Sequence, residues 1–528
     1  MAIKRFIATA DTTITNAFLE DLSTRATGAN IGLADSLEVF SVYGQSSGST
    51  NGLTSELSRI LVKFPVTTAD DSTNSIQAKR TAGTIPASGS VSFYLRMYNV
   101  AHHETLPVNA KYNIFAVSSS WEEGRGMDLD TYTDKTLDGV GANWINASDA
   151  SLWGLYGGDY HTGSNVAVMY SQTMATGDED IEVDVSELVE QWIKGTKSNY
   201  GIGVFLTSSQ EAYFSSSTGV SLSAASGGVL HNLSGDTTSY HTKKFSARSS
   251  EYFYKRPCIE ARWKSATKDD RGNFYYSSSL ASAHENLNTI YFYNYFRGSL
   301  RNIPAVGGGL IYLNIHSGSS LDTAPSGAPL VLVGDGDNVR PAAPTVVTGG
   351  YVSTGIYSAS FALTAASTPV QTLYDVWWSG ASQYHTGTIK TSLVSPSAIA
   401  PNTRHVSSVT NLRNIYRDNE TARFRVHTRQ KDWSPTIYTK AVAQAETNII
   451  ESGSYEIYRV VDDLKVIPYG TGSDLHTQMS FDLSGSYFDL DMSMLESGYM
   501  YGIRLSYYNQ SVGSWVEQPE IFKFRVED

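Results

Sequence analysis

Short stretches in which apolar and polar side chains alternate recur through the first half of the chain. A period of two is typical of a β-strand that buries one face and leaves the other facing solvent. The expected strands are 36–43, 58–66, 89–98, 111–117, 181–185 and 201–207. The first half is therefore predicted to be a β-sheet domain.

One stretch between two of these strands has a helical pattern instead. Ser186 is a good N-cap residue, and Gly195 is a good stop signal. Three large apolar residues between them share one face of a helix, and these are Leu188, Val189 and Trp192. We expect a short amphipathic helix over 186–194, lying across one end of a β-sandwich.

Residues 266–340 are predicted to form a small β module followed by a linker. A dense aromatic run at 288–303 and a second strand signal at 310–315 are separated by a three-glycine turn, which favours a hairpin. Turn-forming residues at 335–338 and 341–344 then mark the linker.

The remainder of the chain, 341–528, carries short strand signals separated by turn signals. A spacing of ~8–12 residues between such signals is typical of immunoglobulin-like sandwiches. The pattern fits one large domain or two smaller ones. We expect two immunoglobulin-like domains, 341–445 and 446–528, and we find no internal repeat of fixed period.

The composition agrees with an all-β chain. Charged residues make up only 17% of the 528 residues, and 33 are tyrosine. Aromatic and β-branched side chains pack well on a pleated sheet. The net charge of −13 is spread along the chain without a Lys/Arg block, so the electrostatic signature of a nucleic-acid-binding protein is missing. The single cysteine, Cys258, excludes an intrachain disulfide and predicts a buried, unreactive thiol.

The N-terminus and the apolar segments bear on localisation. The opening residues lack an apolar run long enough for a signal-peptide core, and no segment approaches the ~20 apolar residues of a membrane span. We therefore expect a protein without a membrane span that stays in the cytoplasm or leaves the cell by a route such as virus assembly and lysis.

Several motifs of the first half follow one another as they do in a known family. They are Ala10–Ala17, Gly28–Val39, Ser58–Phe64, Ser120–Gly124, Asn143–Trp144, Val183–Val204 and Arg256–Arg262. Together they resemble the DNRLRE domain, a carbohydrate-binding-module-like β-sandwich, over 1–265. The resemblance implies a jelly-roll-like sandwich in which Trp121 is a packing residue.

The whole chain also resembles virion structural proteins of marine tailed phages, especially those that infect cyanobacteria. Such proteins open with a sequence similar to Met1–Phe6 and carry a similar sandwich first. The resemblance implies a virion component, assembled in the host cytoplasm, whose partners are other virion proteins and copies of itself. The neck, tail, baseplate and capsid surface all remain open as its location.

Candidate catalytic or metal groups are few. The adjacent histidines His102 and His103 would point to opposite faces of a regular strand, so we expect a polar loop there. The carboxylates of Asp128, Asp130 and Asp134 do not match the EF-hand calcium pattern, which requires glycine and glutamate at later positions. No P-loop, nucleophile elbow or zinc-protease motif is present. The chain is predicted to be non-enzymatic and to need no cofactor or metal.

Glycan binding is the alternative function. Sugar sites use exposed aromatic rings as flat apolar platforms with polar groups at the rim. The loop 141–165 is rich in Gly, Asn and Asp and contains four candidate rings: Trp144, Trp153, Tyr156 and Tyr160. The loop is consistent with a platform for host surface glycans on an adhesin, or with an aromatic surface buried against a neighbouring subunit. The predicted fold class is all-β and multidomain, with an N-terminal jelly-roll-like β-sandwich, a small β module and C-terminal immunoglobulin-like β-sandwiches.

Overall fold

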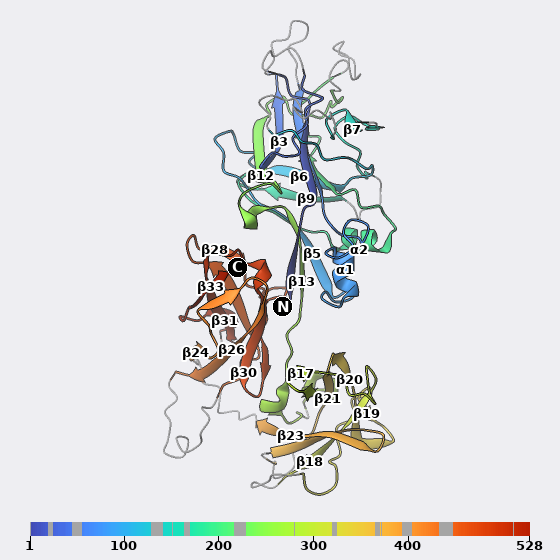
Figure 1. The fold of residues 1–528 in the computed structure, drawn as a ribbon, viewed down its shortest axis with the longest axis vertical. Coiled ribbons are helices and arrows are strands. Elements are labelled where there is room, and N and C mark those ends of the chain that lie inside the picture. The colour runs from blue at the N-terminus through green and yellow to red at the C-terminus, as the bar shows by residue number, and fades with distance from the viewer. Residues whose placement is uncertain are drawn as a thin grey trace. The chain divides into compact units, whose positions relative to one another are not determined.

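The structure is a computed structural model of the chain (Figure 1). It describes residues 2–19, 25–44, 55–127, 141–149, 151–162, 169–215, 229–278, 280–318, 325–364, 370, 372–392, 404–431, 447–509 and 512–528. The predicted all-β, multidomain fold is confirmed. The chain divides into two compact units, Ala2–Lys264 and Ser265–Asp528. In the described part of the chain, no helix is long and apolar enough to cross a membrane.

The Ala2–Lys264 unit is a sandwich of two antiparallel sheets. One sheet has the order β1-β13-β5-β10, with β1 Ile3–Ile7, β13 Cys258–Trp263, β5 Val91–Met97 and β10 Ile181–Asp184. The other has the order β12-β3-β4-β11-β6-β9, with β12 Tyr240–Ser246, β3 Ser36–Tyr43, β4 Ser55–Lys63, β11 Ile202–Leu206, β6 Ala110–Ala116 and β9 Met169–Met174. Strand β2 Ala10–Thr15 pairs with β4, and β7 Asn146–Ser148 pairs with β8 Ser151–Leu152.

The core of this sandwich follows from the alternation in the sequence. Phe93 and Leu95 of β5 face Ile60 and Val62 of β4 across one buried cluster. Alternate residues of a strand point to opposite sides, so the other positions of β4 point away from this core. They are buried too, because a second cluster lies on the outer side of the larger sheet. We call this second cluster the outer cluster; its buried members include Leu57 and Leu61 of β4.

The predicted helix is confirmed as α2 Ser186–Lys194, with Leu188, Val189 and Trp192 buried. The predicted cap is wrong: Ser186 is the first helical residue, and its hydroxyl accepts a hydrogen bond from the Phe93 N–H at 2.7 Å. The helix ends at Gly195, whose φ of 71° lies in the left-handed region that glycine adopts without strain. A second helix that the sequence pattern did not indicate is α1 Ile76–Thr81, which is capped by the Ser75 side chain.

The Ser265–Asp528 unit begins with a curled sheet, which we call the middle module (residues 270–392). The strand order is β14-β23-β22-β18-β20-β21-β15, and β19 pairs with β20. The strands are β14 Phe274–Tyr275, β15 Asn288–Tyr293, β18 Ile311–Ser317, β19 Val339–Arg340, β20 Ala343–Ser353, β21 Ile356–Phe361, β22 Thr372–Ser379 and β23 Ser382–Ser392. The Asn288 side chain bridges the end strands, because it bonds both the N–H and the carbonyl of Tyr275.

Two predictions for this region are wrong. The aromatic run and the strand after it do not form a hairpin with each other, since β15 pairs with β21 and β18 lies between β20 and β22. The run instead folds back on itself as β16 Tyr295–Phe296 and β17 Ser299–Leu300, because Arg297 and Gly298 both adopt positive φ. The predicted boundary at 340 is crossed by these pairings, so 266–340 is not an independent module.

A buried ion pair closes the middle module. Arg271, in the short 3-10 helix η5 Asp270–Gly272, forms a two-bond ion pair with Asp375 of β22, and Nη2 lies 2.8 Å from Oδ2. The Arg271 Nη2 also donates to the Tyr291 carbonyl at 3.0 Å, and Trp377 Nε1 donates to Asp375 at 2.6 Å. Gly387 lies opposite Asp375 in the register, and a side chain there would occupy the space of the guanidinium.

The C-terminal module (residues 404–528) has immunoglobulin-like strand order. Named A to G along the chain, its sheets are A-B-E-D and A′-G-F-C-C′, which is the immunoglobulin arrangement. The first sheet contains β24 His405–Val409, β26 Thr421–Gln430, β30 Gly485–Asp491 and β29 Ser480–Asp482. The second contains β25 Ile415–Arg417, β33 Phe522–Glu527, β31 Met500–Asn509, β27 Gly453–Arg459 and β28 Leu464–Ile467, with β32 Ser514–Glu517 as an added hairpin strand.

A second hallmark supports this assignment. Near the start of strand F, the Tyr501 hydroxyl donates to the Glu496 carbonyl at 2.7 Å, which is the tyrosine corner of immunoglobulin-like domains. The module is one domain rather than the C-terminal half of a pair. Strand β26 pairs with β30 across the predicted boundary at 445, so that boundary is wrong.

Candidate functional site

The four rings of the predicted glycan platform belong to the outer cluster of the Ala2–Lys264 unit. Trp144 is 0% exposed and Trp153 is 4% exposed, and Tyr156 and Tyr160 are half-buried against the same cluster. A stacking platform requires a ring face open to solvent. Neither tryptophan has an open ring face, so Trp144 and Trp153 lack the exposure that was expected of a glycan platform.

Backbone hydrogen bonds hold this loop inward. Trp153 Nε1 donates to the Asn143 carbonyl at 2.8 Å, and the Gly157 N–H donates to the Trp144 carbonyl at 2.8 Å. Gly157 has a φ of 80°, and a side chain there would collide with the Trp144 ring. Trp121 also packs on this cluster and donates to the Tyr200 carbonyl at 2.7 Å. The side chains of Trp144 and Trp153 thus form part of the protein interior.

A buried ion pair lies at the centre of the outer cluster. Arg59 of β4 contacts Glu211 through three hydrogen bonds of 2.9–3.0 Å and donates to the Gly157 carbonyl at 3.1 Å. Its guanidinium lies over the ring of Trp144, 5.5 Å from the centroid, and over that of Phe205 at 4.8 Å. Burial lowers the pKa of Arg59, but the Glu211 charge outweighs it and holds that pKa above its usual value.

The other candidate groups that the structure describes are buried, ion-paired or located in a loop. Cys258 is buried, and burial raises the pKa of its thiol to about 12. Glu123, an acidic residue two positions after Trp121, forms an ion pair with Arg248. His102 and His103 lie in the predicted loop, while Asp128, Asp130 and Asp134 lie outside the described residues. No group of three or more metal-binding side chains occurs in the part of the chain that is described.

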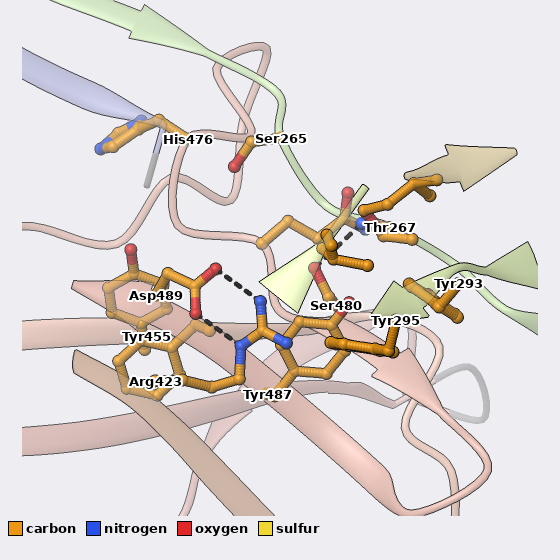
Figure 2. Close-up of a pocket in the computed structure, with 14 residues that line it drawn as sticks. Ser265, Thr267, Tyr293, Tyr295, Arg423, Tyr455, His476, Ser480, Tyr487 and Asp489 are labelled. Carbon is orange, nitrogen blue, oxygen red and sulfur yellow. Dashed lines mark hydrogen bonds and ion pairs between the residues drawn. The ribbon is translucent and has the colours of Figure 1, made fainter. Parts of the chain in front are cut away.

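A cavity of about 260 Å³ lies in the Ser265–Asp528 unit (Figure 2). Its aromatic lining consists of Tyr293, Tyr295, Tyr455, Tyr487 and Phe488, and its polar lining includes Arg423, Asp489, His476 and Gln478. Ser265 and Thr267 contribute to one wall. This segment is held in place because the Thr267 N–H donates to Ser480 Oγ at 2.9 Å and the Asp269 N–H donates to the Phe481 carbonyl at 3.1 Å.

An ion pair crosses the floor of this cavity. Arg423 and Asp489 lie opposite each other in the antiparallel register of β26 and β30, and their two hydrogen bonds measure 2.8 and 3.0 Å (Figure 2). The Arg423 guanidinium also lies 4.5 Å from the centre of the Tyr487 ring. The pair remains open to solvent, with 45% of the Arg423 side chain and 31% of the Asp489 side chain exposed.

No pattern in the sequence indicates this cavity. Its residues come from seven separate stretches of the chain, and each stretch looks like an ordinary strand or turn. A signal was present in strand 421–430, where Arg423 and Arg425 occupy alternate positions on one face. Without the partner strand, this pattern indicates only a solvated strand face.

Comparison with known proteins assigns no family. No protein-family model and no curated protein sequence matches the chain. Among solved structures, the N-terminal Ig1-2 module of the Drosophila receptor protein tyrosine phosphatase DLAR is 7% identical, with a TM-score of 0.14, and the match covers 46% of this chain and 91% of that one.

Two further structures are similarly remote. The tandem Ig repeats of Dlar are 9% identical, with a TM-score of 0.13, and the match covers 42% of this chain and 91% of that one. Salmonella alpha-2-macroglobulin reacted with methylamine is 11% identical, with a TM-score of 0.13, and the match covers 99% of this chain and 34% of that one. At such scores the overall folds do not superpose, and the immunoglobulin-like assignment rests on strand order and Tyr501.

Proposed function

We propose that the chain is a non-enzymatic structural component of a tailed-phage particle and works by packing against neighbouring proteins. The resemblance to virion proteins of marine phages supports a location in a phage particle. An exposed apolar surface on the middle module supports a role in packing against other proteins. Large exposed apolar surfaces on soluble domains mark sites of protein contact.

This surface, which we call the apolar end, consists of Phe296, Leu310, Tyr351 and Val352. Each of these side chains is between 40% and 58% exposed. The hairpin that carries Phe296 lies beside the β20–β21 turn, because the Asn294 N–H donates to the Gly355 carbonyl at 2.7 Å. Exposed aromatic residues such as Phe296 and Tyr351 are typical of protein interfaces.

The charges next to the apolar end indicate what covers it. Arg297 and Arg301 lie 5.3 and 5.7 Å from the centre of the Phe296 ring. Arginine beside an aromatic ring is enriched at interfaces, and an acidic partner complements it. The chain has 52 acidic and 39 basic residues, so a second copy supplies acidic surface. Virus particles are built by symmetry, which repeats such a contact.

Polar substitution of the apolar end should abolish self-association. The double variant Phe296→Ser/Val352→Ser leaves the buried core untouched, so it should fold and run as a monomer, whereas the native chain should form a defined oligomer. Size-exclusion chromatography with light scattering on the full chain measures the mass directly. The matched control is Tyr252→Ser, which changes an exposed ring of the other unit and should keep the oligomer. An oligomer that survives the double variant would rule out this surface as the contact.

A further inference from the structure

The cavity of the Ser265–Asp528 unit has the size and lining of a small-ligand site. We infer that it binds one uncharged sugar residue at the end of a neutral glycan. Its volume of about 260 Å³ is below the ~300–1,000 Å³ of pockets for drug-sized ligands. The ligand is therefore a single ring. This binding activity goes beyond the packing role and does not rest on it.

The charges in the cavity select an uncharged ligand. The Arg423 guanidinium is already paired with Asp489, so the floor has almost no net charge. An anionic sugar or a phosphate would approach the Asp489 carboxylate and would meet an arginine that is already neutralised. Both partners are still partly exposed, and their free N–H groups and oxygen lone pairs can bond to hydroxyl groups.

One wall of the cavity contains a hydrogen-bond acceptor that has no donor in the described part of the chain, and a ligand hydroxyl group could donate to it. The Gln478 Oε1 atom is buried and has no hydrogen-bond partner among the described residues. A buried acceptor without a donor is unfavourable, because the desolvation of the oxygen is not compensated by a hydrogen bond. A sugar hydroxyl that donates to this oxygen would satisfy it, and this supplies part of the binding free energy.

Tyr295 supplies the apolar element of the site. Its ring lines the cavity and is 58% exposed, so one face is open to a ligand. The C–H face of a sugar ring packs well on an exposed aromatic face. Neighbouring residues of a strand point to opposite sides, so Tyr295 faces the cavity while Phe296, the next residue of β16, points away from it.

Saturation-transfer NMR on the full chain tests this inference. The probes are free glucose, galactose, mannose and N-acetylglucosamine, with glucuronic acid and sialic acid as anionic comparisons. At least one neutral sugar should give a signal, and the anionic sugars should bind more weakly. Tyr295→Ala and Gln478→Met should each weaken binding by about tenfold. The matched control Phe296→Ala should bind like the native chain.

Three results would overturn the inference. They are the absence of a signal from every neutral sugar, a preference for the anionic sugars, and binding that neither cavity variant weakens. Because Tyr295 is exposed and methionine matches glutamine in length, both variants should fold, and circular dichroism verifies this. Failure here would leave the self-association of the chain unaffected, so the two proposals are tested separately.

Discussion

Asp375→Asn should lower the stability of the middle module by about 3–5 kcal/mol. The Arg271 and Asp375 side chains are 11% and 0% exposed, and removal of the carboxylate charge leaves the guanidinium buried without a counterion. The Trp377 indole would also exchange a charged acceptor for a neutral one, which weakens its hydrogen bond. Hydrogen exchange measured by mass spectrometry should show lost protection in peptides of β18 and β22.

The matched control for this variant is Asp337→Asn in the same module. The Asp337 side chain is 75% exposed and lies 3.6 Å from His284. Exposed ion pairs contribute about 0–1 kcal/mol, so this substitution should change protection by no more than that. If Asp375→Asn behaved like its control, the pair would not hold the module together.

Glu211→Gln should destabilise the Ala2–Lys264 unit by a similar amount, about 3–5 kcal/mol. The substitution leaves Arg59 charged and buried among the rings of Trp144, Tyr160 and Phe205. Because the guanidinium lies over the indole of Trp144, the tryptophan fluorescence should change as well. The difference in urea midpoint for the fluorescence transition gives the loss of stability.

Two variants sharpen this test. Glu251→Gln makes the same chemical change at an exposed position and should have almost no effect. The double variant Arg59→Met/Glu211→Met removes both charges and should be more stable than Glu211→Gln alone, because an apolar pair leaves no uncompensated charge. A double variant less stable than the single one would show that the ion pair itself, rather than the avoidance of an orphan charge, stabilises the cluster.

The sequence predicted local structure well where one face of an element is buried. The strand at 36–43 and the helix at 186–194 have the expected bounds, because alternation or helical spacing directly reflects which side chains reach the core. The run predicted at 58–66 overlaps strand β4, which begins at Ser55 and ends at Lys63. Its nearly continuous burial comes from two cores on opposite sides of the sheet, which a single strand cannot reveal.

The errors in the domain boundaries and in the glycan platform concern partners that are distant along the chain. The boundaries at 340 and 445 failed because strand pairing, such as β26 with β30, leaves no mark in the composition of the linkers. The loop with Trp144 looked exposed because its glycine and polar content is typical of surface loops. Part of what covers it is Arg59, which pairs with Glu211, 152 residues away in sequence, and this pairing cannot be seen from either segment.

The proposed function requires that the chain is built into a virus particle. The most direct test is quantitative mass spectrometry of phage particles purified through a density gradient from a lysate that contains the chain. Peptides from both units should co-purify with the major capsid protein at a fixed ratio that persists through repeated gradients. A chain found only in the soluble fraction of the lysate, and absent from the particle band, would contradict the proposed function.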